Sequence, residues 1–143
     1  MKFLSLALGA LCATTAFAQR VAIGAPADGA SVTAGSNITV EVDRPDTLSS
    51  SVEVAIVIGF NSCASRPCLP PSETIGTLLY NGPYDPEFHT NVSFSKPPHQ
   101  NFTVTIPASA PNGEAQLSVT HFSLIGASLG PFLEILNITL NVV

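Results

Sequence analysis

The residue pair with the greatest catalytic potential is His121 and Ser123, two positions apart in an alternating stretch. A serine nucleophile needs a histidine base and an orienting carboxylate, and no acid lies close to His121 in the sequence. Residues i and i+2 of a strand face the same way without having to meet. The favoured interpretation is therefore a strand histidine with satisfied hydrogen bonds beside the core, and a hydrolase site is the minor alternative.

Apart from Cys12, the cysteines of the chain are Cys63 and Cys68, in the stretch Cys-Ala-Ser-Arg-Pro-Cys. In an oxidising secretory route, a short disulfide loop is the favoured interpretation. A redox site would usually have Cys-x-x-Cys at a helix start, and zinc would need four ligands at characteristic spacings. Both stay open as minor alternatives, and we expect no metal and no cofactor.

Asparagine glycosylation is the modification that the sequence predicts. The sequons Asn-x-Ser/Thr begin at Asn37, Asn91, Asn101 and Asn137. The first, third and fourth alternate with apolar neighbours, so that the asparagine lies on the outward face of a strand. We therefore expect these sequons at the surface, where a glycan can be attached.

The N-terminal segment has the pattern of a secretory signal peptide. Lys2 precedes an apolar stretch over residues 3–12, and residues 16–18 supply the small-x-small pattern before a cleavage site. The apolar stretch is shorter than the roughly 20 residues that span a bilayer. We expect residues 1–18 to be removed and residues 19–143 to form one domain of a secreted, extracellular protein without a membrane span.

Composition and charge exclude several function classes. Ten acidic against five basic residues give a net charge of −5, so no basic surface is available for nucleic acid. Carboxylate pairs of the glycosidase kind, Asp85 with Glu87 or Asp43 with Asp46, lie on proline-containing turns, where solvated side chains are the favoured interpretation. We therefore expect no enzyme activity.

Alternation of apolar and polar residues with a period of two dominates the chain. It predicts an all-β protein, a single Greek-key β-sandwich of the immunoglobulin or fibronectin III type with about seven strands. The expected strands span residues 21–25, 36–42, 52–60, 74–80, 101–106, 114–122 and 133–143. Residues 52–58 are nearly all apolar, as in a central strand whose second face is covered by a loop or a partner.

An apolar cluster follows His121 and consists of Phe122, Leu124, Ile125 and Leu129. Clustered aliphatic side chains of a sandwich usually lie inside, so we expect the cluster in the core rather than on an exposed ridge. His121 itself continues the inward phase of the apolar residues before it.

Several blocks of the chain resemble the Nis-type necrosis-inducing secreted effectors of fungi, and together they span nearly all of residues 19–143. The most specific blocks are Gly-Thr-Leu-Leu-Tyr and Phe-Ser-Leu-Ile-Gly-Ala. The residues that match the family motifs are Gly76, Thr77, Leu78, Tyr80, Gly82, Pro83, His121, Phe122, Ser123, Leu124 and Gly126. Residues 61–71 and 88–100 depart from the family pattern. Because both stretches are expected to be loops, these departures affect the choice of partner more than the fold.

This resemblance implies a small secreted effector without enzyme activity that binds host immune receptor-associated kinases. It would suppress pattern-triggered immunity or induce cell death. A second, shorter similarity covers residues 23–35, which resemble the start of Kre-type cell-wall glucan-assembly domains. It implies the alternative of a cell-wall or glycan-associated structural module.

Overall fold

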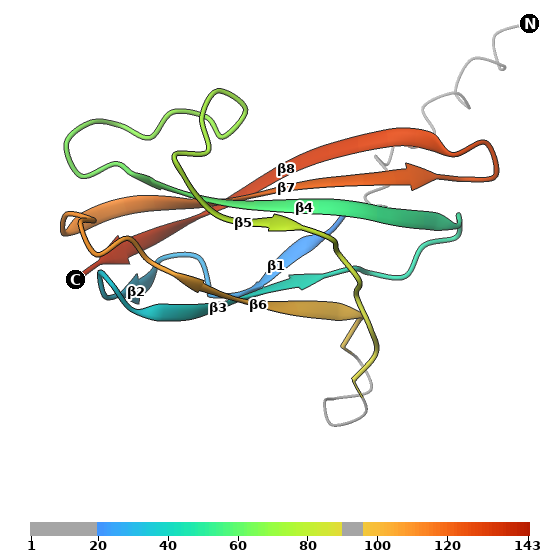
Figure 1. The fold of residues 1–143 in the computed structure, drawn as a ribbon, viewed down its shortest axis with the longest axis horizontal. Coiled ribbons are helices and arrows are strands. Elements are labelled where there is room, and N and C mark those ends of the chain that lie inside the picture. Colours follow the sequence, from blue (N-terminus) through green and yellow to red (C-terminus); the bar gives the residue numbers. More distant parts are fainter. Residues whose placement is uncertain (1–19, 90–95) are drawn as a thin grey trace, which may run out of the picture.

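The computed structural model describes residues 20–89 and 96–143 (Figure 1). The predicted signal peptide and the sequon at Asn91 lie outside the described residues. Within the described residues every regular element is a strand and none is a helix. The same residues contain no helix long and apolar enough to cross a membrane. The all-β prediction is confirmed.

The described chain forms two β-sheets. In chain order the strands are β1 (Ala22–Ala25), β2 (Ala30–Val32), β3 (Asn37–Asp43), β4 (Ser51–Ser62), β5 (Thr77–Gly82), β6 (His99–Thr105), β7 (Gly113–Ile125) and β8 (Gly130–Val142). The smaller sheet has the order β1-β3-β6 and the larger sheet the order β2-β8-β7-β4-β5. Neighbouring strands are antiparallel, except that β2 runs parallel to β8.

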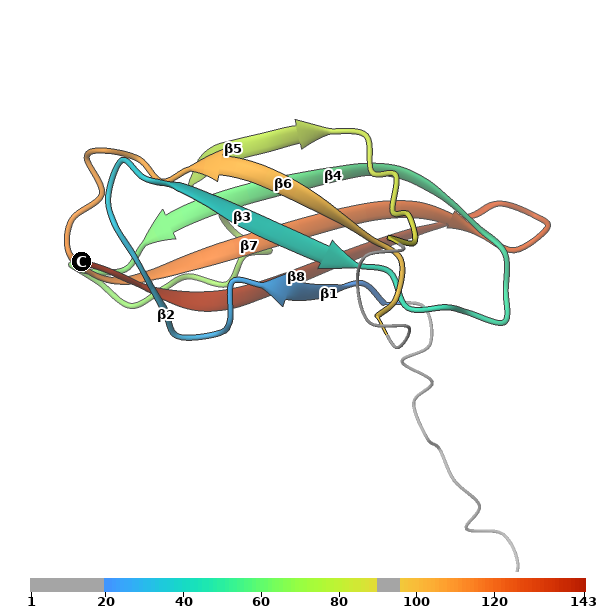
Figure 2. The ribbon, with the colours of Figure 1, turned by 90° about the horizontal axis from the view of Figure 1, so that it is seen from below.

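The two sheets lie face to face, and the hairpin of β7 and β8 extends past the end of the smaller sheet (Figures 1 and 2). The core between them takes every second residue of the long strands. Its fully buried members include Val40, Val42, Ile56, Ile58, Ile106, Leu117, Val119 and Leu140. The period of two in the sequence is therefore the side-chain alternation of a two-layer sandwich.

Residues 63–76, between β4 and β5, fold back over one end of the outer face of the larger sheet (Figure 1). At Gly59 on that face, a Cβ atom would come within 2.5 Å of the Ile75 carbonyl oxygen. The loop therefore lies directly on the strand, and only a glycine admits it. As predicted, the apolar strand is central, between β7 and β5, but its contact with the loop is at Gly59, outside residues 52–58, and on that run Val52 and Val54 are 51% and 39% exposed.

The strands differ from the prediction at several boundaries, among them those of β5, which spans Thr77–Gly82 rather than residues 74–80. The three residues of β2 were not predicted, because alternation cannot show in so short a segment and the partner, β8, is distant in sequence. The hairpin is also longer than expected, since β7 continues to Ile125 and β8 begins at Gly130. The immunoglobulin or fibronectin III type of the sandwich stays a prediction.

The expectation that the apolar cluster after His121 lies in the core is wrong for Phe122, Leu124, Ile125 and Leu129. Leu129 is 51% exposed, and the other three are only partly buried. The inward positions at this end of β7 belong to His121 and to the serine two residues later, both fully buried. Because side chains alternate along a strand, the apolar residues between them point outward.

Gly76→Ala should destabilise the protein more than Gly29→Ala does. Both glycines have a positive φ, 70° and 80°, but a Cβ at Gly76 would lie 2.3 Å from the Phe60 carbonyl oxygen, whereas one at Gly29 meets nothing within 4 Å. The left-handed conformation costs alanine about 1–2 kcal/mol at both positions, and the overpacking adds about 1–3 kcal/mol at Gly76 alone. Urea unfolding measures the free energy of unfolding of both variants. Equal decreases would contradict the close approach of Gly76 to the Phe60 carbonyl oxygen.

Candidate functional site

A buried charge network lies inside the sandwich, at the end where the β7–β8 hairpin extends. Its centre is His121 on β7, whose side chain is 0% exposed. Glu134 on β8 is paired directly with His121, and Glu53 on β4 is paired with Ser123, the next inward residue of β7. Three neighbouring strands of the larger sheet therefore direct ionisable side chains to one point.

Both ring nitrogens of His121 contact carboxylates. Nδ1 lies 3.0 Å from Oε1 of Glu134, and Nε2 lies 2.5 Å from Oε2 of Glu53. A neutral imidazole donates from one nitrogen only, whereas an imidazolium donates from both. The geometry therefore fits a protonated His121 that donates to two carboxylates at once.

Arg44, in the loop after β3, completes the network. Its Nε donates to Oε1 of Glu53 at 2.8 Å, and its Nη2 donates to the Ser51 hydroxyl at 3.0 Å. That hydroxyl donates in turn to the same oxygen of Glu53 at 2.7 Å. Two cations, Arg44 and His121, therefore face two carboxylates, which is the pairing that buried charges need.

Glu134 also holds the start of the described chain. Its side chain is 2% exposed, and its Oε1 accepts a hydrogen bond from the Val21 backbone N–H at 2.9 Å. The second oxygen, Oε2, has no hydrogen-bond partner within the described residues, and Nε of Arg20 lies 3.9 Å away from it. The segment just before β1 is thus fastened to the network by a backbone hydrogen bond.

The pKa values of the network follow from these contacts. Burial by itself would raise the pKa of Glu53, but hydrogen bonds from His121, Arg44 and Ser51 outweigh it and lower that pKa to about 2. Burial would likewise lower the pKa of His121, but its hydrogen bonds to Glu134 and Glu53 raise it above the usual value. Both shifts favour the charged forms of the two partners.

Tyr84 connects the two specific motif blocks. It follows Pro83, is 3% exposed, and its hydroxyl donates to the Val42 carbonyl oxygen at 3.1 Å. Its ring meets the His121 ring edge-on, with 5.3 Å between the centroids. We call the Gly-Thr-Leu-Leu-Tyr stretch with the turn that follows it the β5 block, and the stretch from His121 through Phe-Ser-Leu-Ile-Gly-Ala the β7 block. Tyr84 thus brings the end of the β5 block to the start of the β7 block inside the sandwich, although β4 separates their strands in the sheet.

The β5 motif residues form an edge strand and the turn after it. The Tyr80 hydroxyl donates to the Pro83 carbonyl oxygen at 3.0 Å, and the Tyr80 ring packs against Phe102 at 4.6 Å between centroids. Leu78 is 55% exposed and contributes little to the core. The close ring of Tyr80 also explains Gly82, since a Cβ there would lie 2.7 Å from the tyrosine hydroxyl.

The structure does not support a catalytic pair of His121 and Ser123. The Ser123 hydroxyl is buried without a hydrogen-bond partner in the described residues, and both nitrogens of His121 are occupied by carboxylates. Sequence reasoning also overlooked residues 126–130, which have the Gly-x-Ser-x-Gly spacing of a nucleophile elbow. They form the turn between β7 and β8, with Ser128 exposed, rather than a strand-to-helix turn.

Asp43 departs from the expectation of a solvated carboxylate. It is partly buried at the end of β3, where burial and then the negative charge of Glu41 raise its pKa. Glu41 is itself paired with Lys96, whose Nζ lies 2.7 Å from Oε2. A Cβ at Gly24 would lie 2.3 Å from Oε1 of Glu41, so the glycine leaves room for these carboxylates above β1.

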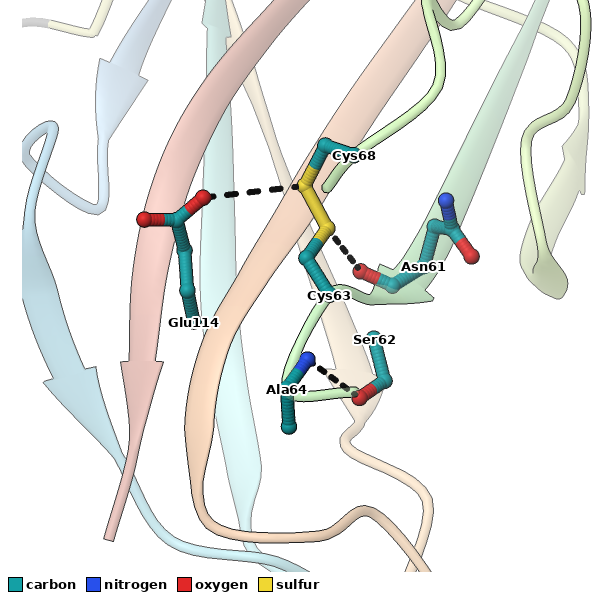
Figure 3. Close-up of a disulfide and its surroundings, with 6 residues drawn as sticks. All are labelled: Asn61, Ser62, Cys63, Ala64, Cys68 and Glu114. Atoms are coloured by element: carbon teal, nitrogen blue, oxygen red, sulfur yellow. Dashed lines mark hydrogen bonds between the residues drawn. A yellow bond between two sulfur atoms is a disulfide. The ribbon is translucent and has the colours of Figure 1, made fainter. Parts of the chain in front are cut away.

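The predicted disulfide between Cys63 and Cys68 is confirmed (Figure 3). Its sulfurs lie near two oxygens, with 3.5 Å from Cys63 Sγ to the Asn61 carbonyl and 3.9 Å from Cys68 Sγ to Glu114 Oε1. The two cysteines and Glu114 are the one group in the described residues with metal-ligand spacing. Because both sulfurs are already bonded to each other, they are not available as the thiolates that zinc needs.

The three sequons that lie in the described residues are exposed, as predicted. Asn37 on β3 and Asn101 on β6 lie on the smaller sheet, and Asn137 lies on β8 of the larger sheet. Asn37 Oδ1 accepts a hydrogen bond from the Thr105 hydroxyl at 2.7 Å. Glycan attachment at these positions stays a prediction.

His121→Ala should lower the free energy of unfolding by about 3–5 kcal/mol, because it leaves the carboxylates of Glu53 and Glu134 buried without the cation they share. Thr120→Ala, at the neighbouring position with the opposite side-chain direction, should cost less than about 1 kcal/mol. Chemical denaturation measures both values. A loss no larger for His121→Ala than for Thr120→Ala would show that the network contributes nothing.

Stability should be greatest in mildly acidic solution. The raised pKa of His121 gives stability that is present below its usual value of 6.5 and is lost as the pH rises through the folded-state pKa. The lowered pKa of Glu53 gives stability that is present above 4.5 and is lost as the pH falls towards about 2. Melting temperatures measured at a series of pH values test this window. The melting temperature of His121→Gln should fall less than that of the wild type as the pH rises, whereas His89→Gln, at an exposed position, should behave as the wild type does.

Comparison with known proteins places these features in a family. A model of the Nis1 family matches residues 16–141 of the chain. The Necrosis-inducing secreted protein 1 of Colletotrichum orbiculare is 34% identical over 146 residues, which cover 99% of this chain and 81% of that protein. Both matches extend over the two motif blocks and over Arg44, Glu53, His121 and Glu134.

Among solved structures, a superoxide reductase (neelaredoxin) from Ignicoccus hospitalis has a TM-score of 0.50 at 16% sequence identity, covering 87% of this chain and 81% of that one. At this identity the likeness concerns the two-sheet fold alone. The similarity to a secreted relative confirms the predicted extracellular localisation. With a family model that spans most of its length and a relative that matches 99% of it, the chain belongs to the Nis1 family.

Proposed function

We propose that this protein is a secreted effector without enzyme activity, which binds host immune receptor-associated kinases. Through this binding it suppresses pattern-triggered immunity or induces cell death. The observation that carries the proposal is the match to a protein named for necrosis induction and secretion over 99% of this chain.

The buried network supports a role without catalysis. His121 has no exposed surface, and both of its nitrogens are held by carboxylates, so it cannot exchange a proton with a bound substrate. An open hollow of about 230 Å³ lies elsewhere, at the junction of β4, β5 and the β6–β7 connection. It is lined by Phe60, Asn61, Ser62, Gly76, Thr77, Pro107, Ser109, Ala110 and Pro111, none of which is acidic, basic, histidine or cysteine.

The strand order supports the immunoglobulin-type Greek key as the form of the sandwich. The chain passes from β3 in the smaller sheet to β4 and β5 in the larger one, and returns with β6 beside β3. It then crosses again to β7, which pairs with β4. Such a scaffold presents loops and sheet faces for binding rather than an enclosed active site. The wall-associated alternative rests on the sequons and on residues 23–35, which form most of β1, β2 and the turns beside them.

Residues 19–143, expressed in leaf tissue behind a secretion signal, should reduce the oxidative burst that a microbial elicitor triggers, or cause local cell death. The purified protein should bind the kinase domain of an immune receptor-associated kinase in calorimetry. Protein with His121→Ala and Glu134→Ala, which removes the network, provides a poorly folded control. No binding to several such kinases, with an unchanged burst and a correctly folded sample, would refute the proposal.

A further inference from the structure

The larger sheet has an exposed apolar surface beside the charge network. We call it the outer apolar face, and it consists of Val52, Val54, Phe122, Leu124, Leu133 and Ile135. The register places Val52 beside Leu124 and Phe122 beside Leu133, so the side chains form contiguous rows across β4, β7 and β8. Leu133 is 62% exposed and Val52 is 51% exposed. The surface is therefore continuous and open to solvent.

At this end of the sheet the usual polarity is reversed. Glu53, His121 and Glu134 point into the sandwich, while their apolar neighbours along the same strands point to solvent. The register that buries the network is the one that exposes the apolar residues. Apolar side chains on the outer face contribute nothing to the core. Such departures from the usual pattern are expected at functional sites.

The borders of the outer apolar face are well defined. Residues 63–76 cover the other end of the same sheet surface, and the sequon residue Asn137 follows Ile135 on the same side of β8. At the free end, two turns are joined by a hydrogen bond from the Gly126 N–H to the Ser50 carbonyl oxygen. Two exposed leucines, Leu48 and Leu129, lie on these turns. No charged residue occurs between positions 122 and 133.

Charge decides which partner fits this surface. The chain has a net charge of −5, so two copies repel each other, and an anionic lipid surface repels it as well. Apolar patches of this kind on monomers measure about 300–600 Å², less than the roughly 800 Å² per partner of a standard stable interface. A protein domain with a basic surface around an apolar centre avoids the repulsion and adds polar contacts at the rim.

We infer that the outer apolar face is the docking surface for a basic host protein domain that presents an apolar patch. Exposed acidic residues, including Asp46 in the adjoining turn, attract the domain over a distance. The charge-free side chains of the outer apolar face then make the close contact. This inference rests on the proposed function and names the surface that performs it.

The test compares aspartate substitutions on and off the outer apolar face. Leu133→Asp and Ile135→Asp each place a charge at its centre, and Val143→Asp, at the opposite end of β8, is the control, with an exposed fraction of 59% against 62% for Leu133. All three positions are exposed enough for the fold to persist, which thermal melts verify. Binding to an immune kinase domain should weaken at least about tenfold for the first two variants and stay unchanged for the control. The association rate of the wild type should fall as salt is added.

Three results would overturn the inference. If Leu133→Asp and Ile135→Asp bind the kinase domain as tightly as the wild type does, the outer apolar face is not the docking surface, and the proposed function stands. Concentration-dependent dimers in sedimentation, abolished by Leu133→Asp, would assign the surface to a second copy. Binding to phosphatidylcholine vesicles that Leu133→Asp abolishes would assign it to a lipid surface.

The leaf assay separates the docking surface from the kinase proposal. If the wild type binds no kinase but still acts in leaf tissue, loss of that action in Leu133→Asp and Ile135→Asp, with Val143→Asp active, supports the surface for another host protein. Retained action in both variants refutes it. If the wild type neither binds a kinase nor acts in leaf tissue, the proposed function and the docking surface both fall.

Discussion

A buried imidazolium between two carboxylates requires β4, β7 and β8 to keep a single register. Moving one strand by one residue would turn its ionisable side chain to solvent and leave the opposite charges buried without a partner, at a cost of several kcal/mol. His121 therefore determines which face of each strand is inward at this end of the sandwich. The long hairpin, the fastening of Val21 and the position of Tyr84 all depend on that register.

The same constraint connects the family motifs to the surface. His121 and Ser123 alternate along β7 with two other family-motif residues, Phe122 and Leu124, which lie on the outer side of the sheet. The β7 block thus serves two purposes at once, because its inward residues hold the charge network and its outward residues make the outer apolar face. The β5 block reaches the network through Tyr84, the residue that follows its last member. A binding function for the family is consistent with motifs that build a surface and its support rather than a cavity.

Sequence patterns predicted the local features correctly. Alternation identified the long strands, the solvent-facing sequons and the all-β class, because the side-chain direction in a strand depends only on neighbouring residues. The short loop between Cys63 and Cys68 likewise needs no information from the rest of the chain. Alternation could not identify β2, since Ala30–Val32 becomes a strand only through its pairing with β8. It also could not supply the acids of the network, which lie 68 and 13 positions from His121 in the sequence.

By itself the sequence determined which residues share a face of each strand, which cysteines can join and which family the chain resembles. Its alternation placed His121 inward, in phase with the apolar residues before it, but it did not show that Phe122 and Leu124 on the opposite face stay outside the core where the hairpin extends beyond the smaller sheet. Hydrophobicity favours burial of Phe122 and Leu124, and it was outweighed by Glu53, Glu134 and Arg44, which arrive from other strands and loops. Only the tertiary structure brings these charges together, and buried charges must be paired, so the fold decided that the histidine is enclosed and the apolar residues remain exposed.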